Sequence, residues 1–237
     1  MANFSYLERR AELKTYFDRT AVDAWARLTT DAPVSSIRAT VRAGRDQMRA
    51  VLLARLPADL TGQTLLDAGC GTGALAVEAA RRGARVTAVD LSPTLVQLAR
   101  ERTPRDLGAG SINFAAGDML DPPGGTFDHV VCMDSLIHYE AADITGALSR
   151  LAARATRTIV FTVAPQTPAL AVMWAVGRAF PKSDRAPAIE PIRPTALIVC
   201  IEREPRLAGW GAAASERVSR GFYISQAMTL TREAARS

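Results

Sequence analysis

Cysteine and histidine are scarce in this sequence, which has three cysteines and two histidines among its 237 residues. The cysteines (Cys70, Cys132 and Cys200) are odd in number and widely spaced, which excludes a disulfide framework and favours a reducing, cytoplasmic setting. The sequence contains no CxxC pair, no Cys/His cluster and no carboxylate cluster with metal-ligand spacing. We therefore expect no metal site formed by the protein itself.

Long hydrophobic stretches are also lacking. The longest uninterrupted apolar run, Ala169–Val176, is far shorter than the roughly 20 residues that a membrane-spanning helix needs. The first residues, MANFSYLERR, carry charges and no apolar core, so they do not read as a secretory signal. The sequence predicts a soluble protein with at most peripheral membrane contact.

Charge is only mildly unbalanced, at +5 from 29 basic and 24 acidic residues, and no basic block stands out. This balance favours an anionic ligand or surface over nucleic acid. Four arginines at helical spacing lie on one face of a predicted helix: Arg38, Arg42, Arg45 and Arg49. They form either a solvated basic face or a receptor for an anionic substrate.

The order of apolar segments predicts an α/β fold. Residues 1–60 read as a helical arm or lid, and residues 61–237 as the main domain. Short apolar strands then alternate with helices, which indicates a doubly wound parallel sheet. The expected strands are 64–69, 85–92, 112–118, 127–136 and 157–165, and the expected helices are 74–82, 93–102 and 142–155.

Proline marks a different region after the fifth strand. Seven of the 13 prolines lie between Pro165 and Pro205, so residues 166–208 are predicted to be a helical insertion. Within it, 169–180 reads as an apolar helix, and 195–204 is ambiguous between strand and helix, with its position favouring helix. The segments 212–218 and 222–228 alternate as strands do and are expected to close the sheet as an antiparallel pair.

A glycine-rich turn joins the first strand to the first helix of the sheet. The segment Asp67-Ala-Gly69-Cys70-Gly71-Thr-Gly73 places glycines where positive φ and a close ligand approach are needed. Asp90 ends the second strand, where a carboxylate can accept both ribose hydroxyls, and Asp118 ends the third. The three acids should therefore share the carboxyl edge of the sheet.

Two cofactor classes fit these glycines. Gly69-x-Gly71-x-x-Ala74 satisfies a relaxed dinucleotide motif, so an NAD-dependent oxidoreductase is one alternative. Asp67 stands close to the turn, however, and its charge opposes a pyrophosphate at the helix N-terminus while favouring a ligand that carries an ammonium group.

The whole pattern resembles the class I S-adenosylmethionine-dependent methyltransferases over about residues 60–165. The resemblance implies that Asp67 and the 69–73 loop hold the methionine end, Asp90 the ribose, and Asp118 with Met119 the adenine. The implied set of cofactor-binding residues is Asp67, Gly69, Cys70, Gly71, Gly73, Asp90, Leu91, Asp118, Met119 and Asp134. Asp121-Pro-Pro-Gly resembles the motif of amino-methylating enzymes, but it lies after the third strand and lacks the aromatic residue, so it reads as a turn.

Four further segments, YFDRTAVDAWARL, SSIRATVRAGRDQM, DSLIHY and IVFTVAPQTPALAVMWAVGRAFP, are similar to the magnesium-protoporphyrin IX O-methyltransferase family. Thr29 and the proline-rich insertion favour a purple-bacterial variant. The resemblance implies methylation of a porphyrin propionate, in bacteriochlorophyll synthesis, with magnesium present only in the substrate ring. It implies His138 as the catalytic residue and Tyr16, Trp25, Arg42, Arg45 and Tyr139 as substrate-binding residues.

His138 either aligns the carboxylate or, as a secondary possibility, acts as a base, and a role confined to the cofactor pocket is the alternative to both. A propionate is already ionised at neutral pH, so alignment and removal of water are the expected obstacles. The porphyrin-binding subunit of magnesium chelatase is a candidate partner. Alternatives to this function are methylation of another hydrophobic small molecule, such as a quinone precursor, and a non-enzymatic porphyrin carrier.

Overall fold

The computed structural model describes residues 4–16, 36–167 and 188–233, and its centre is one seven-stranded sheet. Two predicted features, the helix at 169–180 and Trp25, lie outside these residues. Five strands are parallel: β1 (Thr64–Ala68), β2 (Arg85–Asp90), β3 (Ser111–Ala116), β4 (Phe127–Cys132) and β5 (Ala155–Val163). β7 (Tyr223–Arg232) pairs antiparallel with both β5 and β6 (Trp210–Arg220).

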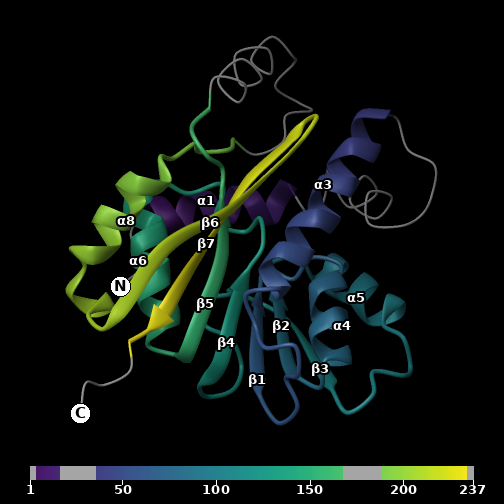
Figure 1. The fold of residues 1–237 in the computed structure, drawn as a ribbon. Helices are drawn as coiled ribbons and strands as arrows, with labels where there is room; N and C mark the ends of the chain where they lie inside the picture. Colours follow the sequence, from purple (N-terminus) through teal and green to yellow (C-terminus); the bar gives the residue numbers. More distant parts are fainter. Residues whose placement is uncertain (1–3, 17–35, 168–187, 234–237) are drawn as a thin grey trace.

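The strand order β3-β2-β1-β4-β5-β7-β6 reverses direction between β1 and β4 (Figure 1). The connections that follow β1 and β4 run to opposite faces of the sheet, which opens a crevice at the carboxyl ends of these two strands. The predicted doubly wound sheet and its closing antiparallel pair are confirmed. The loop after β1 carries the predicted glycine turn, and the loop after β4 carries Asp134, His138 and Tyr139, so the topology brings these predicted site residues together.

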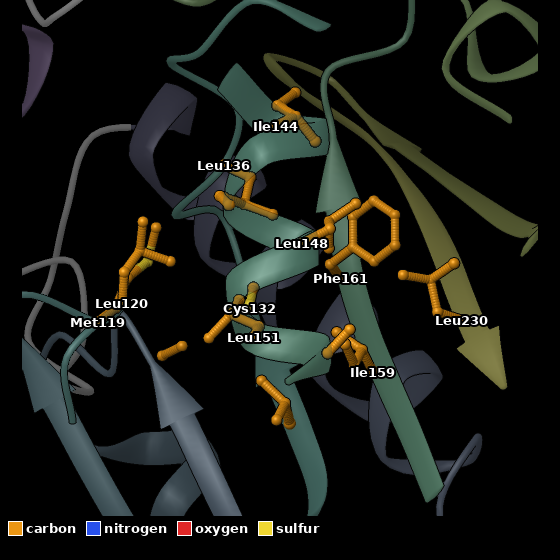
Figure 2. Close-up of a cluster of buried hydrophobic side chains, with 14 of the residues drawn as sticks. Met119, Leu120, Cys132, Leu136, Ile144, Leu148, Leu151, Ile159, Phe161 and Leu230 are labelled. Atoms are coloured by element: carbon orange, nitrogen blue, oxygen red, sulfur yellow. The ribbon is translucent and has the colours of Figure 1, made fainter. Parts of the chain in front are cut away.

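Helices cover both faces of the sheet, each over its own hydrophobic core. One core includes side chains of α3 (Ser36–Leu53), α4 (Ala74–Arg81) and α5 (Pro93–Arg102). The other includes side chains of α1 (Phe4–Thr15), α6 (Ala141–Ala152) and α8 (Pro194–Glu202). Figure 2 shows the second core, where Leu148 and Leu151 of α6 lie near Phe161 and Ile159 of β5.

The ambiguous segment at 195–204 is helical, as its position favoured. Pro194 occupies the first turn of α8, where its fixed φ and missing N–H cost nothing. Leu197 and Ile201, four residues apart, are buried in the same core as α6. A short 3₁₀ turn at Pro205–Leu207 then leads into β6.

All five parallel strands end earlier than the sequence predicts, and β4 differs most. β4 stops at Cys132 rather than residue 136, and β3 stops at Ala116, two residues before Asp118. After β4 the chain turns at Asp134, whose φ of 55° lies outside the range that strand residues adopt. Residues 133–139 therefore form a loop over the crevice, named here the β4 loop.

α3 belongs to the same packed body as the sheet. Met48, Leu52 and Leu53 are fully buried against α4 and the sheet. The boundary predicted at residue 60 therefore falls within one continuous core. Among the described residues, α1 is the one helix that precedes α3, and it belongs to the core on the other face of the sheet.

Candidate functional site

The glycine loop after β1 has the conformation that only glycine adopts readily. Gly69, Gly71 and Gly73 have φ of 89°, 53° and 80°. A Cβ at Gly69 would lie 2.5 Å from the Ser135 Cβ, so the glycine also lets the β4 loop approach. Gly73 is the N-cap of α4, whose amino end thus opens toward the crevice.

Two buried oxygens at this loop lack partners among the described residues. Asp67 is 1% exposed and its Oδ2 accepts no hydrogen bond, and the Ser135 hydroxyl is likewise buried and unpaired. Burial, and then the nearby charge of Asp90, raise the pKa of Asp67 to about 7. A cationic ligand beside Asp67 would relieve this unfavourable arrangement, and nothing in the sequence pointed to Ser135.

Asp90 at the end of β2 holds the backbone around it. Its Oδ2 accepts the Gly71 N–H at 2.8 Å, and its Oδ1 accepts the Ser92 N–H at 2.9 Å. Ser92 in turn caps α5 by accepting the Leu95 N–H. One carboxylate thus joins the glycine loop to the start of α5, both on the cofactor side of the crevice. Cys70 contributes a thiol whose pKa burial raises, so it stays protonated.

Asp118 is approached by the amino-terminal helix. Its Oδ1 accepts the Tyr6 hydroxyl at 2.9 Å and the Leu120 N–H at 2.9 Å, and its Oδ2 pairs with Arg10 at 2.7 Å. The Tyr6 ring stacks on Tyr139, with centroids 4.9 Å apart. Tyr139, predicted to bind substrate, is therefore a buried neighbour of the predicted adenine acid. The adjacent positions Met119 and Leu91 pack against the α6 core.

Asp134 is held by three distant elements. Its Oδ1 accepts the Tyr223 hydroxyl at 3.0 Å and the Thr162 hydroxyl at 3.3 Å, and its Oδ2 pairs with Arg45 at 3.0 Å. Thr162 also accepts the Asp134 N–H at 2.7 Å. Tyr223 and Thr162 were not among the predicted site residues, because an isolated tyrosine or threonine within a strand gives no signal in the sequence.

His138 lies in the β4 loop, buried beneath α1. Its Nδ1 is 3.0 Å from the carbonyl oxygen of Ala188, which connects the loop to the segment before α8. Burial lowers the pKa of His138, against smaller opposing effects of the Ala188 carbonyl and Asp134. Beside it is a cavity of about 150 Å³ lined chiefly by Ser5, Glu8, Arg9, Glu12, His138, Glu140 and Asp143. The other histidine, His129, contacts Gln63 Oε1 at 2.7 Å within the sheet.

The four arginines of α3 have different roles. Arg45 pairs with Asp134, and Arg49 bridges Asp46 and Glu78. Arg42 is half-buried, and Arg38 is exposed at the start of the helix. Tyr16 follows α1 and is half-buried. The row is therefore not a uniformly solvated face, since internal ion pairs engage two of its members.

The residues present fit an adenosyl ligand with an amino-acid end. Asp67 offers an orphaned anionic oxygen for an ammonium, and Asp90 a carboxylate at the ribose position. The glycines leave room that a Cβ would fill, and the N-cap of α4, Gly73, has no side chain to cap the first turn of the helix. Among the described residues no cluster of His, Cys, Asp or Glu could hold a metal ion, and none of the described helices could span a membrane.

Family models match two overlapping parts of the chain. Residues 132–232 match magnesium-protoporphyrin IX methyltransferase C-terminus, and residues 65–157 match a methyltransferase domain. Magnesium-protoporphyrin O-methyltransferase of Rhodobacter capsulatus is 51% identical over 94% of this chain and 96% of its own length. The protein of the same name from Synechocystis is 33% identical over 74% of this chain and 77% of its own.

Solved structures give the same picture. Magnesium protoporphyrin IX methyltransferase from Synechocystis PCC 6803 with bound SAH has a TM-score of 0.77 and 28% identity, covering 94% of this chain and 100% of that one. A ubiquinone biosynthesis O-methyltransferase of Xanthomonas oryzae is 36% identical, but over only 50% of either chain.

Proposed function

Because the chain belongs to the magnesium-protoporphyrin O-methyltransferase family, we propose that it methylates a propionate of Mg-protoporphyrin IX, with S-adenosylmethionine as the donor. The product is the monomethyl ester, an intermediate of bacteriochlorophyll synthesis. The observation that carries this proposal is the extent of the likeness. Identity to the Rhodobacter protein runs through nearly the whole chain, whereas the likeness to the quinone enzyme covers half of it.

S-adenosylmethionine supplies an electrophilic methyl group when it is bound. Asp67 receives its ammonium, Asp90 its ribose hydroxyls and Asp118 the amino group of its adenine. Asp67 is buried with one orphaned oxygen, so a cation there stabilises the ionised carboxylate. The methyl acceptor must then enter from the side of the β4 loop, where His138 lies.

The surroundings of His138 favour a base over a hydrogen-bond donor. A carbonyl oxygen only accepts hydrogen bonds, so the Nδ1 that faces Ala188 carries the proton. Burial lowers the pKa of the ring, which is therefore neutral at pH 7 with its lone pair at Nε2. Such a lone pair repels an ionised carboxylate but accepts the proton of a carboxylic acid.

His138 is therefore proposed to remove the proton of a propionic acid as the methyl group is transferred. A propionate moved out of water into a buried crevice has a raised pKa and binds a proton more readily. In this role the histidine supplies an ionised nucleophile at the moment of transfer, in the absence of solvating water. Between alignment of the carboxylate and action as a base, this tautomer supports action as a base.

The function is tested by incubating the purified protein with labelled S-adenosylmethionine and Mg-protoporphyrin IX, followed by mass analysis of the pigment. We expect a gain of one methyl group on the porphyrin. Metal-free protoporphyrin and a catechol quinone precursor are the matched alternative acceptors. Transfer to the quinone precursor alone would reject the porphyrin assignment, and stabilisation of the fold by NAD but not by S-adenosylhomocysteine would reject the methyltransferase assignment.

The finer expectations on partner and location remain proposals: a cytoplasmic protein that receives porphyrin from a magnesium chelatase subunit and contacts membranes peripherally. The outward side of α8 supports a surface of this kind, because Ala196, Val199 and Cys200 are exposed on it. Co-sedimentation with lipid vesicles tests the membrane contact, and co-sedimentation with the purified chelatase subunit tests that partner. Val199→Glu should weaken whichever interaction uses this side of α8.

A further inference from the structure

We propose that Tyr223 and Arg45 are positioning residues that fix Asp134 in its left-handed conformation and thereby aim the β4 loop that carries His138. The inference rests on the proposed function of His138 as the group at the methyl acceptor. It assigns Asp134 to the support of this loop, whereas the family resemblance placed it among the cofactor ligands.

Asp134 adopts a conformation that needs support. It is the one described non-glycine residue with positive φ, at 55°. Aspartate enters this region more readily than most residues, but the conformation is still unfavourable for a residue with a Cβ and persists only where the surroundings enforce it. The backbone consequence is a sharp turn directly after β4, which directs residues 135–139 over the crevice rather than along the sheet.

Both carboxylate oxygens of Asp134 are engaged. Oδ1 accepts hydroxyls from Tyr223 and Thr162, and Oδ2 pairs with Arg45, while only 7% of the side chain is exposed. These contacts tie the Asp134 carboxylate to β5, β7 and α3, and the Thr162 hydroxyl also accepts the Asp134 N–H, so side chain and backbone are held together. Burial, and then the charge of Asp134, raise the pKa of Tyr223, so its hydroxyl remains a donor throughout the neutral range.

Arg45 and Tyr223 come from a junction between α3 and the β6–β7 hairpin. The hairpin rises beyond the end of β5 toward α3 (Figure 1). Two glycines permit this contact. A Cβ at Gly44 of α3 would lie 2.6 Å from the Tyr223 ring, and one at Gly221 of the hairpin would lie 2.7 Å from Thr40 Oγ1. The closing hairpin is thus docked on α3, which sets the height of the Tyr223 hydroxyl above the sheet.

The β4 loop transmits this placement to His138, four residues after Asp134. Ser135 packs against Gly69, and the Tyr139 N–H donates to the Leu136 carbonyl, so the loop is short and tightly turned. The orientation of His138 therefore depends on where the turn at Asp134 begins.

The test uses the fact that the chain has only two histidines. His129 contacts Gln63 in the sheet and serves as an internal reference for His138 in proton NMR. The charged groups around His138 come from its own loop, α1, α6 and the segment before α8: Asp134, Arg9, Glu8, Glu12, Glu140, Asp143 and Glu190. All but Asp134 are unchanged in every variant used.

Tyr223→Phe keeps the ring against Gly44 and removes only the hydroxyl. We expect the His138 resonance to shift and its titration midpoint to rise toward the ordinary value, while His129 is unmoved. With Mg-protoporphyrin IX, kcat should fall by roughly 10-fold or more, because small misplacements of a reacting group are costly. The dissociation constant of S-adenosylhomocysteine should change less than twofold.

Asp134→Gly separates positioning from ligand binding, because glycine adopts φ of 55° without support. We expect Asp134→Gly to retain more activity than Asp134→Ala, and Tyr223→Phe to have no added effect in the glycine background. An unmoved His138 signal in Tyr223→Phe, equal shifts of both histidines, or additive effects of the two substitutions would overturn the proposal. The NMR arm requires no substrate, so it is decided independently of whether the porphyrin is the acceptor.

Discussion

The crevice at the carboxyl edge of the sheet has two halves that are built differently. On the cofactor half, Asp90 holds the N–H groups of Gly71 and Ser92, which are 19 and 2 residues away. Asp118, at the adenine end of the cofactor half, is the exception there, held by Tyr6 and Arg10, 112 and 108 residues away. On the acceptor half, Asp134 is held by Tyr223, 89 residues away, and His138 contacts the Ala188 carbonyl, 50 residues away. One half is made of backbone and neighbours in sequence, and the other of side chains brought together by the fold.

This difference suggests how the two halves tolerate change. A local backbone loop binds a cofactor shared by many enzymes, and it is fixed by a few short contacts. The acceptor half depends on α1, α3 and the β6–β7 hairpin, so a substitution far from the chemistry can alter it. We expect substitutions in the two halves to impair cofactor binding and methyl transfer separately.

Removal of the imidazole should have the largest effect. His138→Ala is expected to lower kcat by roughly 10²- to 10⁴-fold, the range of a positioned acid–base group. Affinity for S-adenosylhomocysteine should stay close to that of the parent, because the residue lies on the acceptor half. Normal turnover at saturating cofactor with weakened binding would instead place His138 in the cofactor pocket.

The same residue predicts a pH profile. A base must be unprotonated, and burial lowers the pKa of His138 below 6.5. The kcat should therefore fall as pH drops through that lowered pKa and stay level above it, until other groups titrate. A rate that declines instead as pH rises through this range would show that the protonated imidazole acts.

Asp90→Ala should weaken the cofactor half. The ribose hydroxyls lose a charged acceptor, which contributes about 1.5–3 kcal/mol, or roughly 10- to 100-fold in the dissociation constant measured by calorimetry. Asp90→Asn is the matched control, since its amide keeps one acceptor for the Gly71 N–H. An unchanged affinity in Asp90→Ala would contradict the ribose assignment.

Cofactor affinity should also depend on the ionisation of Asp67. Because its pKa is raised to about 7, the carboxyl is largely protonated below that pH and cannot pair with an ammonium. Affinity for S-adenosylmethionine should rise with pH up to about 7 and then level off. The dependence should be absent in Asp67→Asn, which binds weakly at every pH, and its persistence there would assign the titration to another group.

The smallest expected effect concerns the amino-terminal arm. The sequence predicts a lid over residues 1–45, but α3 begins at Ser36 and is packed on the sheet, so the closing element is expected to be α1. The pair of Arg10 with Asp118 joins α1 to the adenine acid. Arg10 is about one-third exposed, so its loss should cost only about 1 kcal/mol or less. Arg10→Ala should speed cleavage of the arm severalfold by thermolysin, which does not need arginine. Cofactor and porphyrin should slow cleavage in the parent, and equal rates with and without them would reject the lid.

Sequence reasoning succeeded where the signal is local. The glycine pattern with Asp67 and Asp90 indicated a ligand turn, because positive φ and close backbone approach require glycine at those positions. The alternation of strands and helices indicated the sheet, and the position of residues 195–204 in the chain favoured the helix that α8 forms. The early end of β4 was not predictable from propensity, since VVCMDSLI reads as a strand until tertiary contacts turn the chain at Asp134.

The sequence by itself determined the fold class, the cofactor loop and the family, because each is encoded by residues close together along the chain. Only the tertiary structure decided that Arg45 faces Asp134, that Tyr6 and Arg10 meet Asp118, and that Ala188 sets the tautomer of His138. These contacts join residues 50 to 112 positions apart. Their hydrogen bonds and ion pairs exist because burial of the two cores fixes α1, α3 and the closing hairpin around one edge of the sheet.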